Sequence, residues 1–234
     1  MKIVFFSDVH GNQYAFARFL QELREHPVDQ VVFLGDVFGY YYGQRSILES
    51  LRKSDFACLL GNHDKMYLDL LDGRRPVAEL CQRYGSSYER NLAEIPAEDQ
   101  AFLRGLPREW HMRCDGLEIA AFHGSPGNPL EGRVYPDTPI SDPAPYRSYD
   151  YVILGHTHHK MVRRVGHTTV INPGSLGQQR DGKGCSYLVL DTEARTYTFR
   201  VVEYDLEPLM REIEMLDLDK PFLSEVLTRR PRST

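Results

Sequence analysis

KIVFFSDVHGN, at residues 2–12, is the stretch from which the fold is inferred. Its first five residues form a short apolar run, typical of a strand buried on both faces. The polar residues Asp8 and His10 follow directly, and apolar side chains at helical spacing continue from Asn12 until Pro27. A buried strand, a polar turn and an amphipathic helix together indicate the first unit of an α/β domain.

The same pattern recurs along the first third of the chain. VVFLG at 31–35 and ACLLG at 57–61 are further buried apolar runs, and a second helix is expected over 44–53. These elements predict a β-α-β-α-β arrangement with parallel strands. The amphipathic, helix-rich stretch at 65–106 is interpreted as an insertion packed beside that sheet.

The rest of the chain is expected to complete a single domain over residues 1–234. A hairpin is predicted at Asp115-Gly116, because both residues tolerate positive φ. Six prolines at 126–145 predict a long ordered loop, and a helical tail follows from about residue 207. The remaining apolar runs, expected to form an antiparallel second sheet, are YVILG at 151–155, TTVIN at 168–172, SYLVL at 186–190 and TYTFRVV at 196–202.

Composition excludes several classes of protein. The 234 residues include 28 Lys and Arg against 33 Asp and Glu, a net charge of −5, which argues against nucleic-acid binding through bulk basicity. No apolar stretch approaches the roughly 20 residues that span a bilayer, and the N-terminus lacks a secretory pattern. The four cysteines are scattered without paired spacing, as expected of reduced thiols. We therefore expect a cytoplasmic protein without a membrane partner.

Polar side chains with metal-binding atoms follow one strand after another. A single histidine at such a place is more often structural, but an ordered set favours a shared site. The carboxyl ends of strands in an α/β sheet converge on one edge, where ligands bind. Oxygen and nitrogen donors without cysteine suit two hydrolytic metal ions that share a carboxylate. The candidates are Asp8, His10, Asp36, Asn62, His123, His156 and His158.

The ordered series D-x-H, GD, GNHD, H and GHTH resembles the calcineurin-like metallophosphoesterase superfamily, from Lys2 to about Tyr204. LGDVFGYYYG and INPGSLGQQRDGKGCSYLVLD resemble its bacterial and archaeal small-phosphoesterase branch. The resemblance implies a four-layer αββα sandwich of two mixed β-sheets, with a dinuclear metal site on one edge.

The resemblance also implies a distribution of ligands over two divalent metal ions. Those of the first ion would be Asp8, His10, Asp36 and His158. Those of the second would be Asp36, Asn62, His123 and His156. Asp36 would bridge the ions, and a hydroxide held between them would attack phosphorus. Such donors favour Mn²⁺ and also admit iron, nickel, cobalt or zinc.

His63 matches the catalytic histidine of the superfamily, which protonates the leaving oxygen or stabilises charge on the phosphoryl group. Asp64 is expected to orient that imidazole and raise its pKa, because an adjacent carboxylate favours the charged ring. The alternative for Asp64 is a helix N-cap.

Four further residues are candidates for contacts with substrate. Asn12 and Asn172 would make polar contacts with substrate or support the ligands, with plain turn chemistry as the alternative. Arg180 would reach a phosphate, and Tyr40 would wall the pocket. The branch's usual GYG-P pattern is GYYYG here, and the proline-rich loop begins two residues after His123-Gly124. The loop is therefore expected to influence substrate choice.

The function predicted from these residues is metal-dependent hydrolysis of phosphate mono- or diesters of small molecules or nucleotides. One alternative is an inactive binding scaffold with the same fold. A protein phosphatase is the other, although GDVFGY lacks the arginine of the GD-x-x-DRG motif that such enzymes carry. The tail is expected to pack on its own domain, with a contact to another subunit of a homo-oligomer as the alternative.

Overall fold

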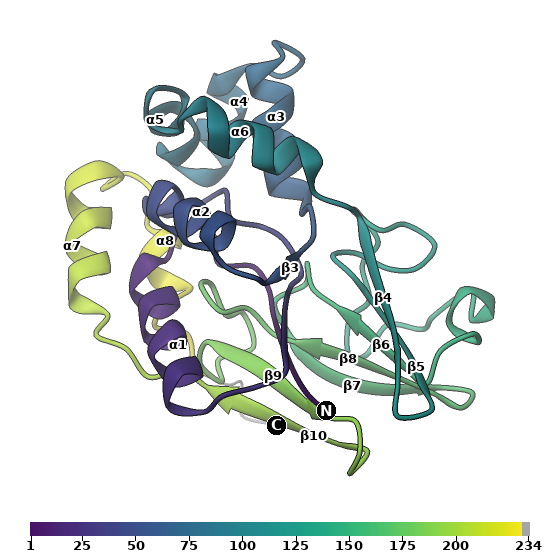
Figure 1. Ribbon diagram of the computed structural model, residues 1–234. Coiled ribbons are helices and arrows are strands. Elements are labelled where there is room, and N and C mark those ends of the chain that lie inside the picture. Colours follow the sequence, from purple (N-terminus) through teal and green to yellow (C-terminus); the bar gives the residue numbers. More distant parts are fainter. Residues whose placement is uncertain (231–234) are drawn as a thin grey trace.

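The computed structural model describes residues 1–230. Within them, ten strands form two mixed sheets of five strands each, packed face to face (Figure 1). The first sheet contains, in spatial order, β10 (Thr196–Val201), β9 (Ser186–Asp191), β1 (Lys2–Phe6), β2 (Gln30–Phe33) and β3 (Ala57–Cys58). The second contains β4 (Glu109–Cys114), β5 (Leu117–Phe122), β6 (Tyr151–Leu154), β8 (Thr168–Pro173) and β7 (Lys160–Val165).

The predicted parallel core of the first sheet is confirmed, because β1 pairs with β2 and β2 with β3 in parallel register. The prediction of an antiparallel second sheet built from the strands after residue 150 is wrong. β6 and β8 run parallel, while β9 and β10 cross to the first sheet, where β9 pairs antiparallel with β1. An apolar run predicts that a strand is buried but not which neighbour it pairs with.

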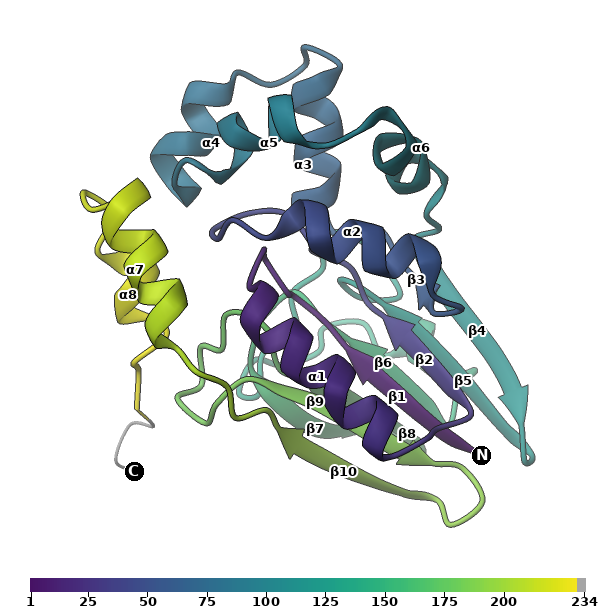
Figure 2. The ribbon, with the colours of Figure 1, turned by 60° about the vertical axis from the view of Figure 1, so that its left-hand side comes forward.

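Helices cover one side of the sandwich. α1 and α2 lie across the outer face of the first sheet, with α7 and α8 beside them (Figure 2). Their bounds are α1 (Gln13–Glu25), α2 (Gln44–Lys53), α7 (Glu207–Leu216) and α8 (Phe222–Glu225). The predicted insertion forms the four further helices α3 (Asn62–Leu71), α4 (Val77–Tyr84), α5 (Ser87–Glu94) and α6 (Ala97–Gly105). It therefore begins three residues earlier than expected.

The outer face of the second sheet has a different cover. Val134 of the proline-rich loop and Tyr146 of the 3₁₀ turn η1 (Ala144–Tyr146) pack there against Phe122 and Val152. The sandwich of two mixed sheets is as predicted. Its fourth layer consists mainly of an ordered loop, because six prolines prevent a regular helix over that stretch.

The tail packs on its own domain, as expected. Leu209, Ile213 and Leu223 are buried in the same apolar cluster as the helices over the first sheet. The last four residues of the predicted tail, 231–234, lie outside the described residues. No helix within the described part of the chain is long and apolar enough to cross a membrane.

The two edges of the sandwich are not equivalent. The N-terminus and the hairpin turns β4–β5, β7–β8 and β9–β10 lie at one edge (Figures 1 and 2). The carboxyl ends of β1, β2, β5, β6 and β8 lie at the other edge, which faces the helical insertion. The polar turns that follow these strands therefore all lie at one edge of the sandwich.

Candidate metal centre

The structure brings all seven candidate ligands together at that edge. Two groups of three lie there, and within each group the metal-binding atoms are within 4.8 Å of one another. The groups are Asp8, His10 and His158, and Asp36, His123 and His156. The seventh candidate, Asn62, places its Oδ1 2.8 Å from Nε2 of His123. All seven side chains are buried.

The first group contains two imidazoles that face each other. His10 donates from Nδ1 to the carbonyl of Phe38 at 2.6 Å, and His158 donates from Nδ1 to the carbonyl of Gln178 at 2.6 Å. Their Nε2 atoms are 3.0 Å apart. Burial lowers the pKa of His10 well below its usual range and also lowers that of His158, so both Nε2 atoms present lone pairs. Two such lone pairs repel each other unless a cation accepts both.

The second group is organised in the same way. His123 donates from Nδ1 to the carbonyl of Leu34 at 3.0 Å and directs Nε2 toward Oδ2 of Asp36, 3.3 Å away. Burial is the largest single influence and lowers the pKa of His123, but the charge and hydrogen bond of Asp36 together with the charges of Asp8 and Asp64 outweigh it, so the pKa is raised. A backbone partner that fixes the non-ligating nitrogen is the usual support of metal-binding histidines.

The two aspartates leave one oxygen each without a partner. Asp8 accepts the backbone N–H of His156 through Oδ2 at 3.0 Å, and Asp36 accepts that of His63 through Oδ1 at 2.8 Å. Oδ1 of Asp8 and Oδ2 of Asp36 are buried with no hydrogen bond. Such orphaned oxygens are rare, because each costs several kcal/mol when no cation compensates it.

Oδ2 of Asp36 lies between the two groups. It is 3.7 Å from Nε2 of His10 and 3.3 Å from Nε2 of His123. A carboxylate in this position is able to bridge two cations and relieve their mutual repulsion. The donor set is therefore one that fits two divalent ions.

The backbone at this edge is strained. Left-handed φ values occur at five of the seven candidates, namely Asp8 (56°), His10 (49°), Asp36 (70°), His156 (67°) and His158 (60°). Each costs about 1–3 kcal/mol and persists only where the surroundings enforce it. Gly61 shows how tight these turns are, because a Cβ there would lie 2.0 Å from Oδ1 of Asp36.

Asp64 does not have the partner expected from the sequence. Its carboxylate accepts four backbone N–H groups, those of Asp36 (2.8 Å), Val37 (2.8 Å), Phe38 (3.1 Å) and Gly61 (3.0 Å), and makes no hydrogen bond to the His63 ring. The alternative, an N-cap role for Asp64, is not met either: the N-cap of α3 is Gly61, and Asp64 is the third residue of the helix, whose carboxylate accepts the N–H of that N-cap. The predicted pairing of Asp64 with His63 is wrong, because four orphan donors attract the carboxylate more strongly than one imidazole does.

His63 lies among aromatic rings instead. Its ring centroid is 4.9 Å from that of His10, and Nδ1 is 2.9 Å from the hydroxyl of Tyr88. Burial, followed by the neighbouring charge of His10, lowers the pKa of His63 well below its usual range, opposite to the expected direction. Tyr84 and Tyr88, both from the helical insertion, were not predicted as site residues. Their only signal is two tyrosines four residues apart in a charged stretch.

The structure does not place the two candidate asparagines against a substrate. Both side chains are fully buried. Asn12 caps α1 by accepting the N–H of Ala15 and donates to the carbonyl of Gly177. Asn172 donates to the carbonyl of Gly155. Both therefore support loops at the site, and the expected substrate contacts are not available to them.

Tyr40 and Arg180 do lie beside the first group. Arg180 donates to the Tyr40 hydroxyl at 2.8 Å, and the Tyr40 ring is 4.8 Å from the His10 ring. A second guanidinium, missed in the sequence, comes from the proline-rich loop, where Arg133 donates from Nε to Nε2 of His156 at 3.0 Å. Two arginines thus flank the candidate metal centre.

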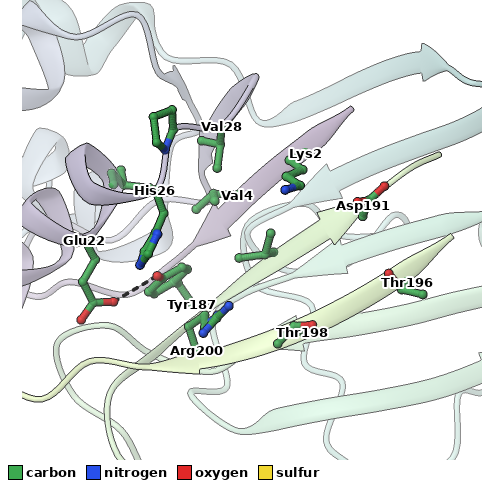
Figure 3. A pocket seen from close by; sticks show the side chains of 13 residues that line it. Lys2, Val4, Glu22, His26, Val28, Tyr187, Asp191, Thr196, Thr198 and Arg200 are labelled. Carbon is green, nitrogen blue, oxygen red and sulfur yellow. Dashed lines mark hydrogen bonds between the residues drawn. The ribbon is translucent and has the colours of Figure 1, made fainter. Parts of the chain in front are cut away.

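A well-formed hollow lies elsewhere. It has a volume of about 290 Å³ and lies between the end of α1 and strands β1, β9 and β10 (Figure 3). Lys2, Arg200, Tyr187 and Glu22 line it, and the hydroxyl of Tyr187 donates to Glu22 at 3.0 Å. None of the candidate ligands is part of its lining. The hollow and the metal-binding geometry therefore occupy different parts of the molecule.

Comparison with known proteins gives one family and several structures. The calcineurin-like phosphoesterase superfamily domain matches residues 1–195. An uncharacterized protein of Methanocaldococcus jannaschii is 26% identical over 233 residues, covering 90% of this chain and 91% of that protein.

Two solved structures are similar over nearly their whole length. A hypothetical protein of Pyrococcus horikoshii has a TM-score of 0.79 at 20% identity, covering 98% of this chain and 99% of its own. A metallophosphoesterase of Sphaerobacter thermophilus has a TM-score of 0.76 at 25% identity, covering 97% of this chain and 98% of its own.

Proposed function

Because this chain belongs to the calcineurin-like phosphoesterase superfamily, we propose that it hydrolyses phosphate mono- or diesters of small molecules with two divalent metal ions. One observation carries the proposal: Oδ2 of Asp36 is buried and unpaired between two groups of ligand atoms. An inactive scaffold has no need for such an oxygen, which is costly unless a cation binds it.

The proposed ligands fall into the two groups that the geometry defines. Asp8, His10 and His158 would hold the first ion, and Asn62, His123 and His156 the second, with Asp36 shared. When bound, the ions would supply a nucleophile derived from water and positive charge against the phosphoryl oxygens. Carboxylate, amide and imidazole donors favour Mn²⁺ and also suit iron, nickel, cobalt or zinc.

Contacts within the chain orient the proposed ligands. Backbone carbonyls hold the imidazoles of His10, His123 and His158 in the form that leaves Nε2 free for a cation. Asp64 fixes the loop that carries Asp36 through its bonds to backbone N–H groups of that loop. These contacts exist without substrate, so the site does not have to reorganise when substrate binds.

His63 is the proposed catalytic group, because its ring lies beside the first group of ligands. With Nε2 protonated, the neutral ring would donate a hydrogen bond to the leaving oxygen, whereas transfer of a proton would require the imidazolium form. Arg180 and Arg133 are placed to bind phosphoryl oxygens, and Tyr40 lies between Arg180 and His10. We assign substrate choice to these rim residues and to the proline-rich loop, since loops at a rigid site usually determine specificity.

One substrate panel tests this function. The purified protein would be assayed with bis-p-nitrophenyl phosphate, p-nitrophenyl phosphate, cyclic nucleotides and dinucleoside polyphosphates, each with Mn²⁺, iron, nickel, cobalt or zinc and after chelation. We expect hydrolysis of at least one ester with Mn²⁺, lost on chelation and restored by metal. Activity that survives complete metal removal, or no hydrolysis of any ester with any of the five metals, would contradict the proposal.

A further inference from the structure

The orientation of His63 needs an explanation, because Asp64 does not supply it. The ring is packed against aromatic side chains, with its centroid 4.6 Å from that of Tyr84 and 5.4 Å from that of Tyr40. Flipping an imidazole by 180° exchanges nitrogen and carbon positions with almost no change in shape. Packing alone therefore does not determine which ring atom faces the metal centre.

One polar contact to the ring breaks this symmetry. Within residues 1–230, the hydroxyl of Tyr88 is the hydrogen-bond partner of the His63 ring, 2.9 Å from Nδ1. The same hydroxyl also lies 3.3 Å from the backbone carbonyl of His63, a second possible acceptor for its single proton, and Nδ1 is the nearer of the two atoms. Nε2 has no hydrogen-bond partner in the described chain and is not among the fully buried unpaired atoms, so it keeps some exposed surface.

We propose that Tyr88 is a positioning residue for His63. Its O–H donates to Nδ1, and this bond fixes both the ring orientation and the neutral form with the proton on Nε2. The purpose that we assign to this arrangement, to present an N–H to the leaving oxygen, rests on the proposed function. The orientation itself is a property of the metal-free chain.

The surroundings of Tyr88 are suited to this role. Tyr88 is fully buried in α5, and its ring lies 5.9 Å from Tyr84 and 6.4 Å from Phe38. A Cβ at Gly39 would lie 2.6 Å from the same Nδ1 atom of His63, so the imidazole is also seated against bare backbone. The helical insertion thus contributes to the site through a hydroxyl that contacts neither set of candidate ligands.

Tyr88→Phe and Tyr67→Phe form a matched pair of variants. Both tyrosines are fully buried in the same apolar cluster, and each loses one hydroxyl. The Tyr67 hydroxyl donates to the carbonyl of Asn91 at 3.0 Å and has no hydrogen bond to His63. A general loss of packing or stability would affect both variants, whereas loss of His63 orientation would affect Tyr88→Phe alone.

Nitrogen-15 NMR of the histidine side chains gives the first measurement, on metal-free protein and on protein loaded with diamagnetic Zn²⁺. His63 signals are assigned by their absence in His63→Gln. We expect the Nε2–H form in the wild type and in Tyr67→Phe, and a mixture of the two neutral forms in Tyr88→Phe. A wild-type ring protonated on Nδ1 would overturn the proposal without any variant.

Kinetics give the second measurement, on the ester that the panel identifies. We expect Tyr88→Phe to lower kcat by about 10–100-fold, the usual loss when a supporting partner is removed, with KM and metal content unchanged. Tyr67→Phe should retain wild-type kcat. Equal kcat in the two variants would refute the role of Tyr88. If the wild type hydrolyses no ester, the proposed function fails, while the NMR result still decides the orientation.

Discussion

The two edges of the sandwich differ in how their backbone strain is compensated. Left-handed non-glycine residues occur at both edges. Those at the candidate metal centre are Asp8, His10, Asp36, Tyr40, His156 and His158. At the opposite edge, Asp115 and Arg195 take this conformation in exposed hairpin turns. There the carboxylate of Asp115 accepts from the N-terminus at 2.9 Å and from Thr192 at 2.5 Å.

The difference teaches what identifies a site in this molecule. A hollow of about 290 Å³ lies between α1 and strands β1, β9 and β10, yet none of the buried unpaired side-chain oxygens in the described residues belongs to its lining. At the metal centre the oxygens of Asp8 and Asp36 remain unpaired although the backbone positions them at a cost. Strain together with unpaired charge, and not volume, distinguishes the edge that holds the candidate metal centre.

The largest effect is expected from the shared carboxylate. Asp36→Asn removes the charge between the two groups, so kcat/KM should fall by roughly 10⁴-fold or more, because metal ions supply several kcal/mol of transition-state stabilisation. Metal analysis of the purified protein should show fewer than two ions per chain. Asp115→Asn, the same substitution at a left-handed residue of the opposite edge, should leave activity unchanged. Full activity with two ions bound to Asp36→Asn would contradict the comparison.

His63→Gln comes next in size. It should lower kcat on the order of 10²–10⁴-fold, the range of general acid catalysis, with metal content intact. The matched variant is His167→Gln, which changes an exposed histidine in the β7–β8 turn at the opposite edge. Wild-type turnover in His63→Gln would remove this residue from the mechanism.

A smaller effect is expected from Asp64, which supports the loop of Asp36 but is not itself a proposed ligand. Asp64→Asn leaves backbone donors around Asp36 unsatisfied, which should cost about 2–4 kcal/mol in the free energy of unfolding by urea. Metal affinity, measured by titration calorimetry, should fall about 10–100-fold. Asp217→Asn removes a buried carboxylate that accepts from Ser86 and Tyr42, away from the metal centre. It should lower stability without changing metal affinity, and equal metal affinities in the two variants would rule out the supporting role of Asp64.

The smallest effect is expected at the hollow between α1 and strands β1, β9 and β10. Tyr187→Phe removes the hydrogen bond to Glu22 and should cost about 0.5–1.5 kcal/mol of stability. We expect kcat and KM on the identified ester to stay at wild-type values. A clear change in kcat would mean that this hollow takes part in the reaction.

Much of the fold was predictable from local patterns. Short apolar runs located seven of the ten strands, since a buried strand needs little more than consecutive apolar residues, and the hairpin predicted at Asp115-Gly116 accounted for β4 and β5. The missed strand, β7 with sequence KMVRRV, carries three charged side chains and lies at a sheet edge. Edge strands tolerate such residues, so composition does not reveal them. The pairing of β9 and β10 with the first sheet was not predictable either, because it depends on a crossing between sheets.

Part of the candidate site was also predictable from local patterns, and part was not. The seven candidate ligands were found because each follows a strand directly, and the ends of parallel strands meet at one edge. Their binding of metal remains a proposal. The partners of Asp64, the contact of Arg133 with His156 and the hydroxyl of Tyr88 were missed. In each case neighbours in the sequence do not identify the neighbour in space.

By itself, then, the sequence determined the strands of the parallel core, the polar turns that follow them and the kind of ligand that those turns offer. These properties depend on residues within a few positions of one another. The tertiary structure alone decided that Asp64 supports the Asp36 loop, that Tyr88 contacts His63 and that a loop covers the second sheet. Such contacts join separate elements, and which side chains meet is settled only when the sheets and helices pack.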